Sequence, residues 1–315
     1  MITNNGKVFY RYRHFSARTV DLLCHDKLYF AKPSMLNDPL DCRPTLRPDS
    51  SLDDLRALLS YLVKTRVRTE ILDLLDRARF WGKRAETHAQ KQADLESTRV
   101  LNEIVHYAED PDYEVPAEQA ESYLLTHTIQ GELARHYERG VCCFSSTYSD
   151  PLLWSHYGNQ HRGLCIGYDL IREPRPLLHK VLYGKSRIIK TSTIVAALLH
   201  DKEEAQGSLD HDMLLIKARG WSYEREWRLI GRQGEQDSSL RLREVVFGLR
   251  CPDSVKHTVV GALRDRDQPV RFFEIYEIHG SYRLARREPD LGELSRYFPR
   301  TARSGKEIFN GVTND

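Results

Sequence analysis

The sequence lacks any long apolar run. No stretch approaches the roughly 20 apolar residues that a membrane-spanning helix needs, and residues 1–7 do not contain the apolar core of a signal peptide. Strong charge of either sign is also missing, because the formal net charge of +2 gives no general attraction to nucleic acid or to anionic membranes. We therefore expect a cytoplasmic protein that does not contact a membrane.

Cysteine and histidine do not form a metal-binding pattern. There is no CxxC pair and no regular framework among the six cysteines, which are Cys24, Cys42, Cys142, Cys143, Cys165 and Cys251. His156 and His161 are five residues apart, but the sequence fixes no third ligand, although Asp38 and Asp150 are candidates. We interpret the cysteines as reduced thiols and expect no bound metal.

Glycine is nearly absent from residues 51–140, where Gly82 is the only one before Gly131. Leucine recurs in this region every three to four residues, as at Leu52 and Leu55, and that spacing is helical. We predict an insertion of three to five helices over residues 51–140, with charged outer faces. If leucines remain exposed on it, the insertion is a candidate site for a partner protein.

Outside the insertion, short alternating or β-branched segments predict strands separated by short helices. The expected strands span residues 8–13, 28–31, 141–145, 163–168, 180–183, 221–230, 244–247 and 270–276, and the expected helices span residues 16–23, 151–157, 192–200, 213–219 and 253–264. This order predicts an α+β fold whose twisted, mostly antiparallel sheet is flanked by helices. The expected domains are a core at 1–50 and 141–298, the helical insertion at 51–140 and a mobile tail at 299–315.

The segment 221–230 carries the most unusual pattern. If it is a strand, Glu224, Glu226 and Arg228 share one face because side chains alternate, and Trp227 lies on the other. Two carboxylates and a guanidinium on one face suit the wall of a polar cleft. The alternative is a ladder of exposed ion pairs, each of which contributes only about 0.2–1 kcal/mol.

Several short motifs give the chain a resemblance to a known family. They are Tyr10-Arg11-Tyr12-Arg13, Leu28-Tyr29-Phe30, Asn37-Asp38-Pro39, Cys143-Phe144-Ser145, Trp154-Ser155-His156-Tyr157-Gly158, Trp221-Ser222-Tyr223-Glu224-Arg225-Glu226-Trp227-Arg228 and Phe247-Gly248. In combination they resemble a large bacterial family of unknown function that is common in phage-defence neighbourhoods. The resemblance covers residues 8–285 outside the insertion. It implies that His156 belongs to a site. Asn37-Asp38-Pro39-Leu40-Asp41 is first of all a turn, and in the functional interpretation Asn37 or Asp38 faces the same cleft from it.

A more remote similarity concerns the order of three polar elements. ADP-ribosyltransferases of the arginine-serine-glutamate type carry a basic residue on the first strand, a serine-rich strand later and Glu-x-Glu near the end. This chain is similar in order, with Arg11 or Arg13, then Ser145, then Glu224 and Glu226. The resemblance implies an enzyme that uses NAD as a co-substrate, cleaves its nicotinamide–ribose bond and transfers ADP-ribose to a protein or nucleic acid.

That chemistry assigns a role to each element. Glu226 would stabilise the oxocarbenium-like centre, and Glu224 would orient or deprotonate the acceptor. One of the arginines would hold the pyrophosphate, with Arg228 completing the polar wall. Tyr10 or Tyr12 would stack on a flat ring of the ligand. Ser145 or Ser146 would hold the carboxylate in place.

Two other functions remain open on the sequence. Basic residues near the expected cleft suit a nucleic-acid-binding protein or a defence nuclease; these are Arg11, Arg13, Lys32, Arg43, Arg162, Lys185 and Arg187. The third possibility is a non-enzymatic module that binds a partner protein through the helical insertion. We favour the NAD-dependent enzyme, acting as a toxin or a phage-defence effector.

Overall fold

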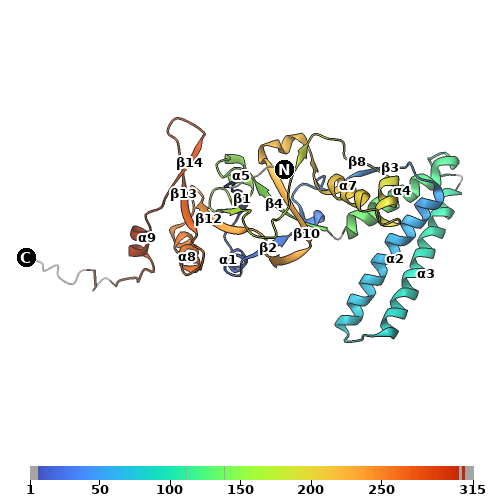
Figure 1. Ribbon diagram of the computed structural model, residues 1–315, viewed down its shortest axis with the longest axis horizontal. Coiled ribbons are helices and arrows are strands. Elements are labelled where there is room, and N and C mark those ends of the chain that lie inside the picture. Colours follow the sequence, from blue (N-terminus) through green and yellow to red (C-terminus); the bar gives the residue numbers. More distant parts are fainter. Residues whose placement is uncertain (1–5, 111, 138, 305–306, 309–315) are drawn as a thin grey trace, which may run out of the picture.

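A large sheet forms the centre of an elongated molecule (Figure 1). This computed structural model describes residues 6–110, 112–137, 139–304 and 307–308. The sheet has eight strands in the order β14-β13-β12-β5-β1-β4-β10-β6. Their bounds are β1 Phe9–Arg13, β4 Arg139–Ser145, β5 Leu164–Asp169, β6 Leu178–Lys180, β10 Glu226–Arg232, β12 Arg241–Phe247, β13 Arg271–Glu277 and β14 Leu284–Arg287. The pairing is antiparallel except between β12 and β13, so the predicted α+β fold is confirmed.

Alternation along β1 assigns its side chains to two different layers. Phe9 packs edge-on against Trp227, with ring centroids 5.3 Å apart, on one face of the sheet. Tyr12 packs edge-on against Trp154, at 5.1 Å, within a separate apolar cluster on the other face. Because side chains alternate, Arg11 lies on the Phe9 face. Both faces of the sheet are therefore covered.

The sheet is nearly split between β1 and β4. On one side β1 pairs with β5 along all five of its residues, from Phe9↔Tyr168 to Arg13↔Leu164. On the other side it pairs with β4 at one position only, Tyr10↔Ser145, whereas β4 and β10 share seven pairs. We call this opening between the two strands the β1–β4 seam.

A glycine fixes the β5 side of the seam. A Cβ atom on Gly163 would lie 2.3 Å from the carbonyl oxygen of Arg13, closer than any side chain tolerates. Only glycine therefore lets the start of β5 approach the end of β1. The position of Arg13 at the seam depends on this contact.

Short strands and turns surround the main sheet. β2 (Lys27–Phe30) pairs with β11 (Gly234–Asp237), β3 (Thr45–Arg47) with β8 (Ile188–Lys190), and β7 (Leu182–Tyr183) with β9 (Ile216–Lys217). Single 3-10 turns cover Pro33–Met35 and Arg219–Glu224, which we label η1 and η2. β9 corrects the predicted helix over residues 213–219, because α7 (Glu203–Leu214) ends before it and Lys217 lies in a strand.

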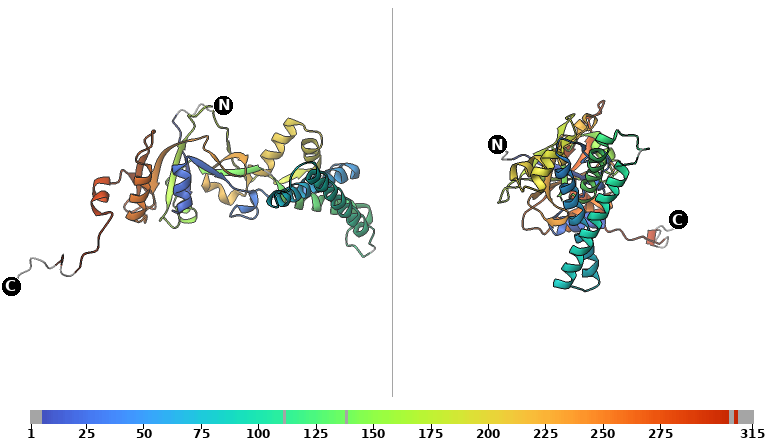
Figure 2. Two further views of the ribbon diagram at one scale, coloured as in Figure 1. Left: turned by 90° about the horizontal axis from the view of Figure 1, so that it is seen from below. Right: turned by 90° about the vertical axis from the view of Figure 1, so that its right-hand side faces the viewer.

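Three helices occupy the glycine-poor region: α2 (Leu52–Arg77), α3 (Lys83–Ala108) and α4 (Ala117–His136). Ser51 caps α2 by accepting a hydrogen bond from the amide of Asp54. Leu55 and other buried residues of these helices share one apolar core with Ile194 of α6 (Thr191–Leu198) and Leu209 of α7. Figures 1 and 2 show α2 and α3 as a long hairpin at one end of the molecule.

Three of the remaining helices, α1 (Ala17–Cys24), α5 (Pro151–His156) and α8 (Asp253–Leu263), lie against the sheet, and α9 (Leu291–Tyr297) lies against α8 (Figure 1). None of the helices in the described ranges is both long enough and apolar enough to cross a bilayer. The predicted mobile tail at 299–315 lies partly outside the described residues.

Candidate functional site

The segment that the sequence predicts as one strand over 221–230 folds in two parts. η2 ends at Glu224, Arg225 adopts a left-handed conformation with φ 48°, and β10 begins only at Glu226. The hydroxyl of Ser145 donates to the backbone carbonyl of Glu224 at 2.7 Å, which fixes the turn against β4. Ser145 therefore positions Glu224 through its main chain, whereas the sequence predicts that it holds a carboxylate.

Both glutamates enter one ionic network, which we call the buried charge cluster. It consists of Asp41, Lys217, Glu224, Glu226 and Arg228, whose side chains are 0–6% exposed. The ammonium of Lys217 lies 2.5 Å from Glu224, 2.9 Å from Glu226 and 3.3 Å from Asp41. These side chains are not the exposed ladder that the sequence left as an alternative.

Arg228 forms the floor of the cluster. Its Nε lies 2.7 Å from Glu226, and its Nη2 lies 2.6 Å from Asp41. Its Nη1 donates to the carbonyl of Leu214 at 2.6 Å and to the sulfur of Cys42 at 3.0 Å. With no exposed surface, Arg228 cannot touch a ligand in the cleft, so it acts on the glutamates and not as the ligand-binding residue that the sequence predicts.

The pKa values of the two glutamates shift in opposite directions from the ordinary value. Burial alone would raise the pKa of Glu226, but Arg228 and Lys217 outweigh burial and lower that pKa to about 2. For Glu224, burial and the nearby charge of Glu226 outweigh Lys217, so its pKa is raised above the ordinary value. Divergent pKa values in an adjacent carboxyl pair are typical of sites that divide charge stabilisation and proton transfer between two residues.

The cluster carries an uncompensated charge. Three carboxylates face two cations, which leaves a formal charge of −1 in a region almost without solvent. Burial works to lower the pKa of Lys217, but the carboxylates, led by Glu226, outweigh it and raise that pKa, so the lysine stays charged. The excess negative charge therefore belongs to the carboxylates that face the cleft.

Tyr157 connects the cluster to the loop after η1. Its hydroxyl donates to Glu224 at 2.7 Å and accepts from the side-chain amide of Asn37 at 2.8 Å. Asp38 is a turn residue, with one oxygen accepting from the amide of Leu40 and the other from the indole of Trp221. The backbone amide of Asp41 also donates to the carbonyl of Asp38 at 3.0 Å, so the turn predicted over residues 37–41 is confirmed, and Asn37 reaches the site from it.

A cleft of about 650 Å³ lies at the β1–β4 seam. Glu224, Glu226 and Lys217 line one part of it, and Arg11 and Arg13 line another. The two arginines belong to the sheet face opposite Glu226, and the open seam is what gives one cleft access to both sets. Its volume falls within the roughly 300–1000 Å³ of small-molecule sites.

Three of the described arginines line the cleft, and two of them, Arg11 and Arg13, lack acidic partners, whereas Arg18 pairs with Glu235 at 3.0 Å. Within the described part of the chain neither Arg11 nor Arg13 forms an ion pair, and Arg11 donates only to the carbonyl of Tyr29, at 2.9 Å. Arg11 and burial together lower the pKa of Arg13 to about 10. Two half-buried guanidinium groups that repel each other are suited to an anion between them.

Of two further predicted residues, Tyr12 lines the cleft and His156 does not. The ring of Tyr12 is packed against Trp154, and its hydroxyl donates to the carbonyl of Thr147, so little of the ring is open to a ligand. His156 is exposed and does not line the cleft; it contacts the rings of Trp221 and Tyr223, with centroids 6.5 and 6.4 Å away.

The motif region now has a counterpart among known families. Residues 153–229 match a family described as Protein of unknown function (DUF2971). This match agrees with the resemblance to a family of unknown function that the motifs suggest. No curated protein and no solved structure matches the chain.

The DUF2971 segment supplies most of the cluster but only part of the cleft. Inside it are Tyr157, Lys217, Glu224, Glu226 and Arg228, and outside it are Arg11, Arg13, Asn37, Asp41 and Ser145. Sequence reasoning missed Lys217 because it placed this residue in a helix. It did not single out Asp41, although the position of this residue two after Asn37-Asp38-Pro39 was a usable signal.

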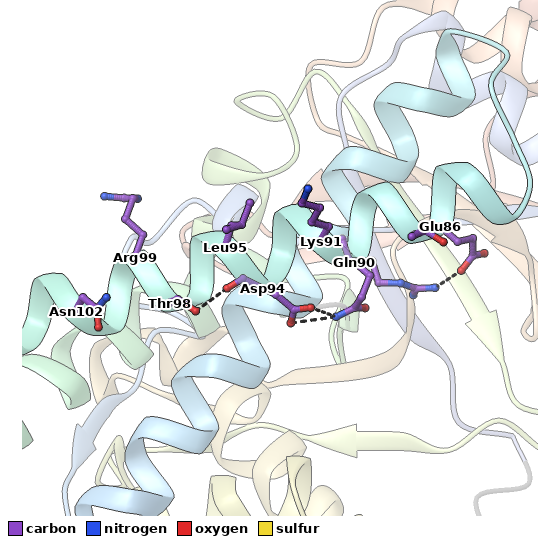
Figure 3. A pocket seen from close by; sticks show the side chains of 10 residues that line it. Glu86, Gln90, Lys91, Asp94, Leu95, Thr98, Arg99 and Asn102 are labelled. Carbon is purple, nitrogen blue, oxygen red and sulfur yellow. Dashed lines mark hydrogen bonds and ion pairs between the residues drawn. The ribbon is translucent and has the colours of Figure 1, made fainter.

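A second hollow, of about 1170 Å³, runs along the outer face of α3 (Figure 3). Its polar groups bond locally, as Gln90 does to Asp94 and Thr98 to the carbonyl of Asp94. It is a solvated helix surface without buried charge, so we do not assign the site to it. The described residues contain no group of three or more His, Cys, Asp or Glu side chains placed to hold a metal ion.

Proposed function

We propose that the cleft binds NAD and that the protein cleaves the nicotinamide–ribose bond as an ADP-ribosyltransferase-like enzyme. The observation that carries this proposal is the opposite charge of the two parts of the cleft. Two arginines without acidic partners line one part, and carboxylates with an excess negative charge line the other. NAD has a pyrophosphate anion and a ribose carbon that becomes positive as nicotinamide leaves.

The arginines suit the pyrophosphate. Each guanidinium offers a planar fork of donors that matches phosphate oxygens in pairs. Their mutual repulsion lowers the pKa of Arg13 in the free protein, and an anion between them would relieve it. Tyr29 also lines the cleft and is half-buried, with the Arg18 guanidinium 4.4 Å from its ring centre, so it is a better stacking surface than Tyr12.

The carboxylates suit the reacting end. When the C–N bond breaks, its electron pair leaves with neutral nicotinamide, and positive charge develops on the ribosyl group. Glu226, whose pKa is about 2, remains ionised and stabilises that charge in a site with little water. Glu224, whose pKa is raised, accepts the proton of the attacking nucleophile as the new bond forms at the ribosyl carbon.

Water or a macromolecule serves as the nucleophile. With water the products are nicotinamide and free ADP-ribose, and with a protein or nucleic acid the product is an ADP-ribosylated acceptor. Either reaction consumes NAD. A protein of this kind would act as a toxin or as a phage-defence effector in the cell that contains it.

The proposal is tested by incubating the protein with NAD and measuring nicotinamide by chromatography. Wild type should release it, and Glu224→Gln should release it at least about 100-fold more slowly, as expected for loss of a general base. Glu277→Gln, at an exposed position on β13, is the matched control and should behave as wild type. Circular dichroism confirms that each variant is folded.

Binding provides an independent measurement. Arg13→Gln should weaken NAD binding about tenfold in calorimetry, because glutamine cannot supply the positive charge that pairs with a phosphate. Arg250→Gln, outside the cleft, should leave it unchanged. The proposal is wrong if wild type neither binds NAD nor releases nicotinamide, or if Glu224→Gln and Glu226→Gln both retain full activity.

A further inference from the structure

The turn that joins α2 to α3 has an unusual composition. Residues 77–84 read Arg-Ala-Arg-Phe-Trp-Gly-Lys-Arg, with four cations, two aromatic rings and no acidic residue. We call this segment the hairpin tip. Each helix has 26 residues, or about 39 Å of length. Figures 1 and 2 show the tip at the free end of the hairpin, away from the sheet.

Both aromatic rings of the tip are exposed. Trp81 is 64% exposed and Phe80 is 48% exposed, although large aromatic side chains usually bury most of their surface. The indole of Trp81 donates a hydrogen bond to Asp76 in the last turn of α2. That bond orients the ring before any partner arrives, so a partner does not have to supply the free energy of ordering it.

The cations of the tip are free to bind an anion. Arg77, Arg79, Lys83 and Arg84 are exposed, and none of them forms an ion pair with any residue in the described ranges. The contrast is close by on the same hairpin, where Arg68 pairs with Glu86 at 2.8 Å. Farther along the hairpin, arginines with exposed side chains are matched by glutamates, as Arg99 is by Glu96 and Glu103.

We infer that the hairpin tip binds single-stranded nucleic acid. Interleaved cations and flat rings are the two components of such sites, because cations neutralise phosphates and rings stack on unpaired bases. A site of this kind needs no enclosed pocket, and it agrees with a net charge that is nearly balanced over the whole chain but strongly positive at the tip.

A membrane is a poorer match for the tip. A helix that lies in a bilayer surface buries a continuous apolar face in it. The apolar residues of α2 face the core instead, as Leu55, Leu58 and Val63 are fully buried. Near the tip the exposed apolar residues are only Leu74, Phe80 and Trp81, which give too little area for stable insertion.

The full chain is titrated against a fluorescein-labelled 20-nucleotide single-stranded RNA and a DNA of the same sequence. Fluorescence anisotropy is measured between 50 and 200 mM salt. Wild type should bind at least one of them, with an affinity that falls as salt rises. The plot of log K against log salt has a negative slope. Arg77→Gln/Arg79→Gln should make that slope less steep by about 1.4, because each phosphate that is no longer neutralised reduces its magnitude by about 0.7.

Two comparisons distinguish binding at the hairpin tip from nonspecific attraction to any positive charge on the protein. Trp81→Ala should weaken binding about tenfold, and Trp81→Phe should restore most of it, because the ring is what stacks. Arg250→Gln/Arg264→Gln removes the same charge at exposed positions on either side of α8, a helix that Figure 1 shows far from the α2–α3 hairpin, and should leave binding unchanged.

Three results would overturn the inference. In the first, wild type binds neither oligonucleotide. In the second, the tip variants bind as tightly as wild type. In the third, wild type ignores both oligonucleotides but binds vesicles of phosphatidylserine and phosphatidylcholine in a Trp81-dependent way, which would make the tip a membrane-binding element. None of these measurements depends on the NAD chemistry, so the two proposals stand or fall separately.

Discussion

The buried charge cluster and the α2–α3 hairpin both contain many ion pairs, but they place them in opposite surroundings. The cluster side chains are at most 6% exposed, whereas Arg99 on the hairpin is 62% exposed. Solvent already stabilises an exposed charge, so its partner adds little, but a buried charge depends on its neighbours entirely. Well-packed apolar residues would often stabilise a fold as well as buried ions do. The burial of the cluster is therefore weak evidence that it stabilises the fold, and it is consistent with the catalytic role that we propose.

The largest expected effect comes from removing a buried arginine, compared with removing an exposed one. Arg228→Met should lower the free energy of unfolding by about 3–5 kcal/mol, because Glu226 and Asp41 lose one of the two cations that they share inside the protein, and Lys217 alone then faces three carboxylates. Arg99→Met makes the same substitution on the hairpin and should change stability very little. Urea unfolding monitored by circular dichroism measures both, and equal losses would remove the distinction between the regions.

Acid should weaken the cluster in a defined pH range. The pKa of Glu226 is about 2 in the folded protein against an ordinary 4.5, so its ionised form stabilises the fold above pH 4.5. This contribution disappears as pH falls from about 4.5 to about 2. The difference in unfolding free energy between wild type and Glu226→Gln should be about 3 kcal/mol at pH 6 and shrink toward pH 2.

The control for the acid titration is Glu103→Gln, which removes an exposed carboxylate that pairs with Arg99. It should give a small difference from wild type that changes little with pH. If the Glu226→Gln difference were constant over the whole range, the low pKa assigned to this residue would be wrong.

A smaller loss is expected from Tyr157→Phe. The variant leaves Glu224 without one of its two donors and Asn37 without its acceptor. A buried carboxylate that loses a hydrogen bond costs about 1–3 kcal/mol, and we expect the lower end because Lys217 remains. Tyr123→Phe on α4, at a 52% exposed ring, is the matched control and should be neutral in the same denaturation assay.

The smallest expected effect is the loss of an exposed ion pair, and it should depend on the salt concentration. Lys64 and Asp94 form a 2.8 Å pair on the hairpin, with both side chains more than 40% exposed. Lys64→Gln should lower the urea midpoint slightly at low salt and not at all in 1 M NaCl, where exposed charges are screened. The destabilisation caused by Arg228→Met should persist in 1 M NaCl, because dissolved ions screen buried charges much less than exposed ones.

Much of the fold follows from periodicity in the sequence. Helical spacing and the lack of glycine correctly locate the helices between residues 51 and 140, and alternation correctly locates β1 and β12. The errors fall where tertiary contacts decide. Residues 213–219 have helical composition, but Ile216 and Lys217 leave the helix to pair with β7, and no local pattern predicts that pairing.

The candidate site could be predicted in part. The paired glutamates and Arg228 were found from alternation, although Glu224 joins them through the left-handed Arg225 and not through a strand. The structure also brings Arg11 and Arg13 to the same cleft. Lys217 could not have been placed, because its role depends on a tertiary contact that brings the distant Asp41 to the same ammonium group as Glu224 and Glu226.

The β1–β4 seam has a mechanical consequence. With one residue pair across it, the strands β14-β13-β12-β5-β1 and the strands β4-β10-β6 are two ladders hinged at Tyr10 and Ser145. A ligand that contacts both β1 and β4 would be a second link between the two sets of strands, in addition to the Tyr10–Ser145 pair. Its binding should then make the two ladders melt as a single cooperative unit, and amide protons on both sides of the hinge should exchange more slowly together.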